Sequence, residues 1–123
     1  MHGEKPATIG ELRCAFECPR PVALNDAFTA GHLYRIAQEA VNNAVKHSRA
    51  RHIVIRLEET AGRLNLVVKD DGNGLPPART GRAEGIGLRV MRHRANVIGA
   101  RLAVETRRGE GVTVRCSLLS RAP

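Results

Sequence analysis

LYRIAQEAVNNAVKHS, residues 33–48, is the stretch that decides the fold, because its pattern is that of one helix with two unlike faces. At about 100° per residue, the apolar side chains of this stretch fall on a single arc. The arc consists of Leu33, Ile36, Ala37, Ala40, Val41 and Ala44. An arc of this kind predicts a helix that packs its inner face on the core of a globular domain.

A polar stripe follows one edge of that arc. Glu39, Asn43 and Lys46 are spaced by four and three residues, so they lie along one side of the helix. A carboxylate, an amide oxygen and a cation in this arrangement suit a hydrated hard cation with phosphate oxygens around it. From the helix alone two interpretations stay open: one wall of a binding site, or an ordinary surface with a contact between Glu39 and Asn43.

Composition narrows the class of protein. With 123 residues and 42% hydrophobic content, the chain has the size of one domain with a single core. Its three aromatic residues are too few for a protein that stacks bases on aromatic platforms. Twenty Lys and Arg residues against twelve Asp and Glu give a net charge of +8. This charge favours an anionic partner, which can be phosphate, a nucleotide, nucleic acid or an acidic protein surface.

The three cysteines, Cys14, Cys18 and Cys116, form no CxxC pair. We expect them to be packing residues, with a metal or redox role as the alternative. The sequence has neither a secretory segment nor an apolar run of about 18 residues. A cytoplasmic location is therefore expected, without membrane contact by this domain.

Alternating apolar residues predict the strands. Residues 9–18, in which Leu12, Cys14 and Phe16 alternate with charged residues, are expected to form a strand that ends before Pro19 and Pro21. Residues 1–8 are expected to be a linker or a frayed terminus. Two hairpins are predicted further along the chain, 53–58 with 64–69 and 102–106 with 112–119.

The long helix is expected to begin near His32, because Gly31 disfavours regular helix before it. Asn25, Asp26 and Thr29 are the candidate cap residues. After residue 48 the chain passes into the first predicted hairpin.

The second strand of that hairpin runs into Asp70 and a glycine-rich turn, DDGNGL, residues 70–75. A carboxylate at the end of a buried strand can accept a hydrogen bond from an exocyclic amine such as that of adenine. Gly72 and Gly74 let the backbone approach a ligand closely. The alternative is a type I′ hairpin around residues 71–72. It is weakened because residues 76–84 do not look like a returning strand.

Residues 76–84 lack a periodic apolar pattern and are expected to form a mobile surface loop. A second helix then opens at Gly85 and Gly87 and ends at Gly99. Its apolar face consists of Leu88, Met91, Ala95 and Ile98. A glycine-rich helix start suits phosphate, because its N–H groups and partial positive charge point outward. A hinge followed by a cap explains the same residues nearly as well.

These motifs occur in an order that resembles the ATP-binding domain of sensor histidine kinases. That domain belongs to the wider GHKL superfamily, with DNA gyrase, the ninety-kilodalton heat-shock chaperone and the mismatch-repair ATPases. The matching stretches are QEAVNNAVKH (38–47), DDGNGL (70–75) and GIGLRVMRHRANVIGA (85–100). The nitrate-sensor branch of these kinases is similar in two respects. These are the sequence of residues 33–48 and the motif GxGLxxMRxR without a separate phenylalanine box. The resemblance covers residues 33–118.

The resemblance implies a role for each matching residue. Asn43 would be the Mg²⁺ ligand, and Glu39 would orient the metal shell or, as in the hydrolysing relatives, activate water. The remaining implied contacts to nucleotide are Lys46 and His47 near the phosphates, Asp70 at the adenine amine, Gly72, Gly74 and Leu75 against the base, and Gly85, Gly87 and Leu88 at the phosphates. Residues 75–85 would form the ATP lid.

One position departs from the family pattern. The family commonly has a threonine directly after the Gly-x-Gly of the last hairpin, but here Val112 holds that place and Thr113 follows. Thr113 is kept as a candidate for nucleotide binding, although strand alternation turns it away from the side of Val112.

The expected fold is a two-layer α/β sandwich, with a mixed sheet of about five strands on about three helices. Residues 1–123 would form one catalytic domain that binds ATP and Mg²⁺ for histidine autophosphorylation in a bacterial two-component system. No His-Asp or His-Glu acceptor precedes the first motif, since His2 and His32 lack that context. The partners implied are a histidine-containing dimerisation domain, in a homodimeric kinase, and a response regulator.

Three other functions stay open at this point. A stand-alone ATPase or anti-sigma serine kinase of the same superfamily would carry the same motifs. A basic nucleic-acid-binding module would account for the charge of +8, although we expect no nucleic acid. A degenerate domain without ATP binding is disfavoured because Asn43, Asp70 and both glycine motifs are intact.

Overall fold

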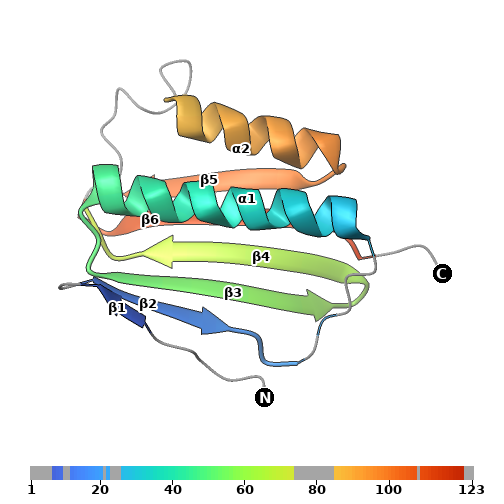
Figure 1. Cartoon of the computed structure of the whole chain (residues 1–123), viewed down its shortest axis with the longest axis horizontal. Coiled ribbons are helices and arrows are strands. Elements are labelled where there is room, and N and C mark those ends of the chain that lie inside the picture. Colours follow the sequence, from blue (N-terminus) through green and yellow to red (C-terminus); the bar gives the residue numbers. More distant parts are fainter. Residues whose placement is uncertain are drawn as a thin grey trace.

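The helices of this protein lie on one face of a mixed sheet, as the computed structural model shows (Figure 1). The structure describes residues 7–9, 12–20, 22, 26–73, 85–107 and 109–120. Within these residues the sheet has six strands in the order β1-β2-β3-β4-β6-β5. The strands are β1 (Ala7–Ile9), β2 (Leu12–Glu17), β3 (His52–Thr60), β4 (Arg63–Asp70), β5 (Arg101–Arg107) and β6 (Gly111–Leu119). The helices are α1 (Ala27–Asn43), its π-helical continuation (Ala44–Ser48) and α2 (Ile86–Val97). The two-layer α/β sandwich is confirmed.

Both predicted hairpins are confirmed, β3 with β4 and β5 with β6. The first turns on Ala61 and Gly62, whose φ values of 54° and 78° are those of a tight two-residue turn. Among the described strand pairs, β2 with β3 is the one that runs parallel. The helix α1 separates these two strands in the chain and carries it across the sheet.

The N-terminal part of the sheet differs from the prediction. Residues 9–18 are not one strand: Ile9 ends β1 and pairs with Leu12 of antiparallel β2. The period-two pattern of Leu12, Cys14 and Phe16 does not extend to Ile9, which lies three residues before Leu12 and is out of phase with it. The single-strand prediction overlooked this shift of phase between the two strands. Ala7 and Thr8 belong to β1 and not to a linker, which raises the strand count from the expected five to six.

The helix α1 begins at Ala27, earlier than the predicted start near His32. The carboxylate of Asp26 caps it, accepting from the Phe28 N–H at 3.0 Å and from the Thr29 hydroxyl at 2.6 Å. A cap of this kind contributes about 1 kcal/mol, which offsets the cost of about 0.5–1 kcal/mol for glycine inside a helix. Gly31 is therefore accommodated within the first two turns.

The C-terminal end of α1 passes into a π-helical turn, Ala44–Ser48, and the chain then leaves the helix at Arg49 in the left-handed conformation, with φ 54°. The α1 and π-helical segments are continuous. The described residues thus form two separate helices, whereas about three were expected. Wider π-type turns are frequent at functional sites, and this one follows Asn43 directly.

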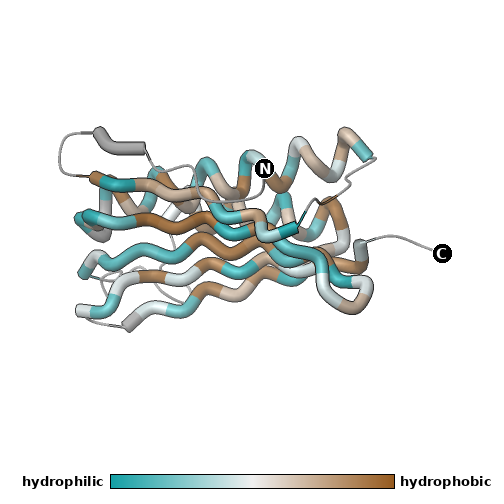
Figure 2. Tube along the Cα trace, turned by 90° about the horizontal axis from the view of Figure 1, so that it is seen from below, coloured by the Kyte–Doolittle hydropathy of each residue, from teal (hydrophilic) through white to brown (hydrophobic). Residues whose placement is uncertain are grey.

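The core is aliphatic, as composition predicts, and lies between the helices and the inner strands. Figure 2 shows hydrophobic stretches along the strands that cross the middle of the sheet. The predicted inner faces of both helices are buried, and the largest fully buried side chains are Ile36, Ile53, Leu64, Met91 and Cys116. Burial raises the pKa of the Cys116 thiol to about 11, which suits a packing residue. Among the described helices, none is long and apolar enough to cross a membrane.

Candidate functional site

Asn43 and Asp70 line one small cavity, although they are distant in the sequence. Strand alternation points Asp70 toward the helices, on the same side as the buried Leu66 and Val68 of β4. The end of α1 lies over this end of the strand. The cavity has a volume of about 10 Å³, close to that of one water molecule. Its lining residues are Ala40, Asn43, Ala44, Val68, Asp70, Leu88, Val112 and Val114.

Asp70 is the buried acid of the site, with 6% of its surface exposed. Its Oδ1 accepts hydrogen bonds from the backbone N–H of Gly72 at 2.8 Å and of Val112 at 3.3 Å. A buried carboxylate is costly unless it is hydrogen-bonded, so these two donors help to stabilise it at the end of β4. The Val112 contact joins β6 to the predicted adenine-binding residue.

Gly111 makes that contact feasible. Its φ is +88°, and a Cβ atom at this position would collide with the carbonyl oxygen of Asp70. The backbones of β6 and β4 can therefore approach at this point only because residue 111 has no side chain. Nothing in the sequence marks this role beyond the presence of a glycine in a turn.

The polar stripe of α1 faces the start of α2. A Cβ atom at Gly87 would lie 2.7 Å from Glu39 Oε2, and 2.9 Å from Asn43 Oδ1. Gly85 precedes α2 in an extended conformation and makes no side-chain cap. The first N–H groups of a helix also lack a carbonyl acceptor within the helix. Glu39, Asn43, Gly85 and Gly87 are thus brought together, and buried Leu88 lines the adjoining cavity.

The other predicted contacts fall into three groups. Gly72 is buried beside Asp70. Lys46 is exposed on the π-helical turn. Gly74, residues 75–84 of the predicted lid, and the side chain of His47 lie outside the described part of the structure.

Thr113 is not brought to the cavity. It pairs with Lys69 and Glu105 across the sheet, on the face away from the helices. Its neighbours Val112 and Val114 are buried and line the cavity in its place. The assignment of Thr113 as a nucleotide contact conflicts with this placement, because adjacent strand residues point to opposite faces.

Asp71, the second acid of the motif, makes a different set of contacts. Its Oδ1 accepts from the backbone N–H of Arg51 at 2.9 Å and of His52 at 2.8 Å, and its Oδ2 lies 2.6 Å from His52 Nδ1. Partial desolvation acts to raise the pKa of Asp71, but the hydrogen bonds from His52 and Arg51 outweigh it and lower the pKa to about 2. Asp71 is therefore ionised throughout the neutral range.

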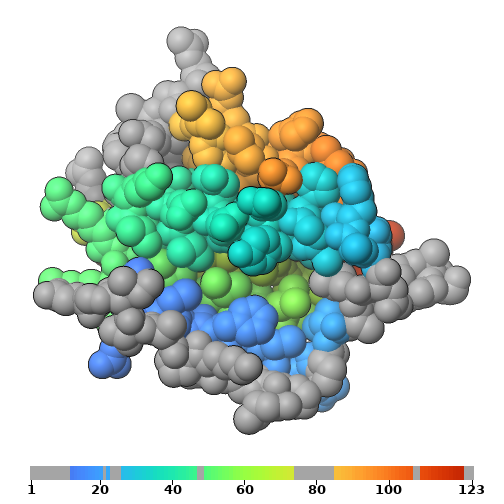
Figure 3. Space-filling view, viewed as in Figure 1, coloured from blue at the N-terminus to red at the C-terminus, as the bar shows by residue number. Residues whose placement is uncertain are grey.

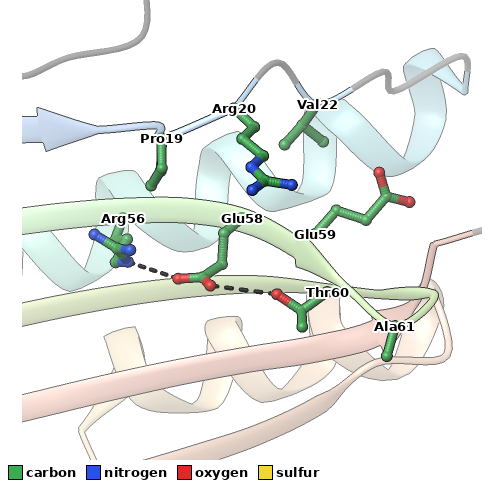
Figure 4. A pocket seen from close by; sticks show the side chains of 8 residues that line it. All are labelled: Pro19, Arg20, Val22, Arg56, Glu58, Glu59, Thr60 and Ala61. Carbon is green, nitrogen blue, oxygen red and sulfur yellow. Dashed lines mark hydrogen bonds and ion pairs between the residues drawn. The ribbon is translucent and has the colours of Figure 1, made fainter.

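Two larger hollows lie elsewhere. One, of about 570 Å³, is at the far end of β3 from Asp70 (Figure 4). Two of its charged side chains pair with each other: Arg56 Nε lies 2.6 Å from Glu58. Glu58 also accepts from the Thr60 hydroxyl at 3.3 Å. None of the predicted site residues lies there.

The other hollow is an apolar groove of about 440 Å³ on the β2 side of α1 (Figure 3). Tyr34 and Val41 line it from the helix, and Phe16 and Ile55 from the strands. Glu39 and Asn43 face the other way, toward Gly87 of α2. The groove and the polar cavity are therefore separate features.

The donor set around Gly87 fits a hard cation bound together with a phosphate ligand. Carboxylate and amide oxygens are the donors that Mg²⁺ prefers, and this ion usually takes one or two protein ligands and completes its shell with phosphate and water. In the described residues no group of three or more His, Cys, Asp or Glu side chains is placed to hold a metal. Glu39 and Asn43 are accordingly the candidates for holding such an ion.

Comparison with known proteins adds a family match. Residues 29–122 match the model of the histidine kinase-, DNA gyrase B-, and HSP90-like ATPases. The chain is 39% identical over 82 residues to the signal transduction histidine-protein kinase/phosphatase UhpB of Salmonella typhimurium, covering 67% of this chain and 16% of that protein. It is 34% identical over 87 residues to DegS of Brevibacillus brevis, covering 70% and 22%. The chain thus spans about a fifth of the length of these relatives.

Solved structures show the same fold. The histidine kinase domain of a blue-light activated kinase from Erythrobacter litoralis superposes with a TM-score of 0.64 at 27% identity, over 75% of this chain and 45% of that one. The ATP-binding domain of PrrB from Mycobacterium tuberculosis superposes with a TM-score of 0.73 at 19% identity, over 93% and 84%. Placement in the nitrate-sensor branch stays a prediction.

Proposed function

Because the chain belongs to the family of histidine kinase-, DNA gyrase B-, and HSP90-like ATPases, we propose that it binds ATP with Mg²⁺ and supplies the γ-phosphate for histidine autophosphorylation. The observation that carries the proposal is the shared cavity of Asn43 and Asp70. The adjacency of these two residues, and not the volume of the cavity, which is close to that of one water molecule, supports a site in which a purine meets the Asp70 carboxylate while the phosphates lie along the polar edge of α1. The naming of UhpB and DegS as histidine-protein kinase/phosphatases supports the choice of reaction.

Each end of the proposed site has a distinct task. Asp70 accepts a hydrogen bond from the exocyclic amine of adenine. Asn43 would hold Mg²⁺ and Glu39 would orient its shell, and the ion would neutralise charge on the phosphate oxygens. Gly85 and Gly87 leave the N-terminus of α2 open toward the phosphates. Lys46 adds a positive charge one turn further along. Phosphoryl transfer needs mainly positioning and charge neutralisation, and these residues supply both.

The acceptor histidine is proposed to come from a dimerisation domain, with a response regulator as the next phosphate acceptor. Of the histidines whose side chains the structure describes, His32, His52 and His93, none lines the cavity. The whole kinase would be a homodimer acting in the cytoplasm. A stand-alone ATPase or anti-sigma serine kinase would use the same nucleotide site, so the site alone does not separate these reactions.

Calorimetry with ADP and ATP, with and without Mg²⁺, tests the nucleotide site. Asp70→Asn is expected to lose about 2 kcal/mol or more of binding free energy, because an amide replaces an acceptor that faces a donor. That is roughly 30-fold in affinity. Asn43→Ala is expected to weaken mainly the Mg²⁺-dependent part of ATP binding.

Thr113→Val serves as the control, since Thr113 pairs with Lys69 on the opposite face of the sheet. It is expected to bind as the wild type does. Equal affinity of Asp70→Asn and wild type would refute the adenine assignment. Salt-dependent DNA binding by the wild type, without any binding of ADP or ATP, would instead favour the nucleic-acid-binding module.

A further inference from the structure

Asp71 ties the loop after β4 to the first residues of β3. Its carboxylate accepts from two consecutive backbone N–H groups, those of Arg51 and His52, and from the His52 ring. Its own N–H donates to the His52 carbonyl at 3.2 Å. An ionised carboxylate is only an acceptor, so His52 Nδ1 carries the proton in this contact. Four contacts thus join residue 71 to residues 51–52.

These contacts begin where the sheet ladder ends. The register between β3 and β4 ends with the pair Ile53 and Asp70. The residues after Asp70 are therefore outside that ladder. Asp71 takes over at the next residue and continues the attachment to β3. Asp70 is therefore held from two sides, by the Val112 N–H from β6 and by the Asp71 contacts from β3.

The exposure of the pair argues against a role in stability alone. The side chains of Asp71 and His52 are 48% and 60% exposed. Exposed pairs of this type typically contribute little to folding. Geometry is affected more strongly, because the contacts restrain the backbone at the residue that follows Asp70. A purine-binding carboxylate depends on such a restraint of its backbone, since misplacement by about 1 Å can cost a large factor in activity or binding.

We propose that Asp71, with His52, is a positioning residue for purine recognition that acts through Asp70. The proposal rests on the proposed nucleotide site and adds to it a second carboxylate that touches no ligand. The low pKa of Asp71, about 2, means that the carboxylate stays charged over the whole range in which binding is measured.

A double-mutant cycle tests the inference, with ADP binding measured without Mg²⁺ so that adenine recognition dominates. Asp71→Ala is expected to weaken binding about tenfold, in keeping with the loss of charge-assisted hydrogen bonds. Asp71→Asn, which keeps an oxygen for the two backbone N–H groups, should fall between Asp71→Ala and wild type. Asp70→Asn combined with Asp71→Ala should bind no more weakly than Asp70→Asn alone, because both changes act on one contact.

His52 supplies a conservative rescue. His52→Asn keeps an N–H donor at the position of Nδ1 and is expected to bind within about twofold of wild type, whereas His52→Leu removes the donor and should weaken binding about threefold, as for one exposed hydrogen bond. A purely structural role would not distinguish these two variants at a temperature at which both are folded.

Asp26→Ala is the matched control for loss of stability. It removes the cap of α1, about 25 Å along the helix from Asn43 at 1.5 Å per residue. It is expected to lower the melting temperature and leave ADP affinity unchanged.

Two results would overturn the proposal: wild-type affinity in folded Asp71→Ala, or additive losses in the double mutant. Absence of ADP binding by the wild type is a different result, because it would refute the proposed nucleotide site itself.

Discussion

Replacing Gly87 by alanine should separate binding from stability. The new Cβ would lie 2.7 Å from Glu39 Oε2 and 2.9 Å from Asn43 Oδ1, with the Asn43 nitrogen at 3.1 Å. Ordinary contact begins near 3.4 Å, so both side chains must move by about half an ångström or more to escape repulsion. The Glu39 and Asn43 atoms that the new Cβ would meet lie at the ends of rotatable side chains. These side chains can move away without a change of the backbone.

The cost should therefore appear in the proposed metal and phosphate contacts. Metal ligands have to keep their distances within about 0.2 Å, and a displacement of Asn43 exceeds that tolerance. We expect the affinity for Mg²⁺-ATP to fall about tenfold or more, as misplacement of positioning groups does elsewhere. Stability should change by less than about 0.5 kcal/mol, because alanine is the better helix former.

Gly31→Ala is the matched control, since Gly31 lies inside α1 and a Cβ atom added to it would have nothing within 4 Å. It should raise the free energy of unfolding by about 0.5–1 kcal/mol and leave nucleotide binding unchanged. The assays are calorimetry with and without Mg²⁺ and urea unfolding. Wild-type affinity for Mg²⁺-ATP in Gly87→Ala would refute the reasoning, because the contact between α1 and α2 would then have no part in binding.

Two further predictions concern the end of β4. Gly111→Ala should destabilise the protein by about 3 kcal/mol or more, since a φ of +88° strains an L-residue and its Cβ would meet the Asp70 carbonyl; a urea-derived loss below about 1 kcal/mol would contradict this. The second prediction concerns the pKa of Asp71, which is lowered to about 2 from about 3.9 in an unfolded chain. The ionised Asp71 carboxylate therefore contributes fully to the free energy of unfolding above about pH 4, and this contribution is lost as the pH falls toward 2. The stability difference between wild type and Asp71→Asn, from urea unfolding at several pH values, should narrow over that window; a difference constant down to pH 2 would be evidence against it.

Local patterns were enough to predict most of the fold. Alternation and turn residues were sufficient for both hairpins, and the apolar arc for the buried face of α1, because those features depend on neighbours in sequence. The errors arose where a contact between distant or reversed segments decided the outcome. Ile9 lies three residues before Leu12 and is out of phase with the alternation of β2, a sign of a second strand that a single-strand prediction overlooks. The start of α1 depended on Asp26 outweighing Gly31.

The candidate site, like the fold, could be predicted only where a residue's role follows from its neighbours in sequence. Asp70 could be identified because a charged residue that ends an apolar strand is unusual there. The roles of Gly111 and Asp71 could not, since each depends on a register or contact with a strand that is remote in sequence. Thr113 is a different case: the family pattern has its threonine at the position of Val112, and strand alternation directs Thr113 to the other face, as the sequence already indicated.

The location of the structural costs is itself an argument for binding. Three features disfavour folding relative to regular alternatives: a buried carboxylate at Asp70, a backbone approach at Gly111 so close that a Cβ atom would meet the Asp70 carbonyl, and a π-helical turn after Asn43. The aliphatic core elsewhere needs none of them, and an apolar residue at position 70 would continue the buried side of β4. All three lie at the ends of elements that meet around one cavity. Because local rules of this kind are usually broken at functional sites, their concentration here favours a ligand at this place over a role in packing.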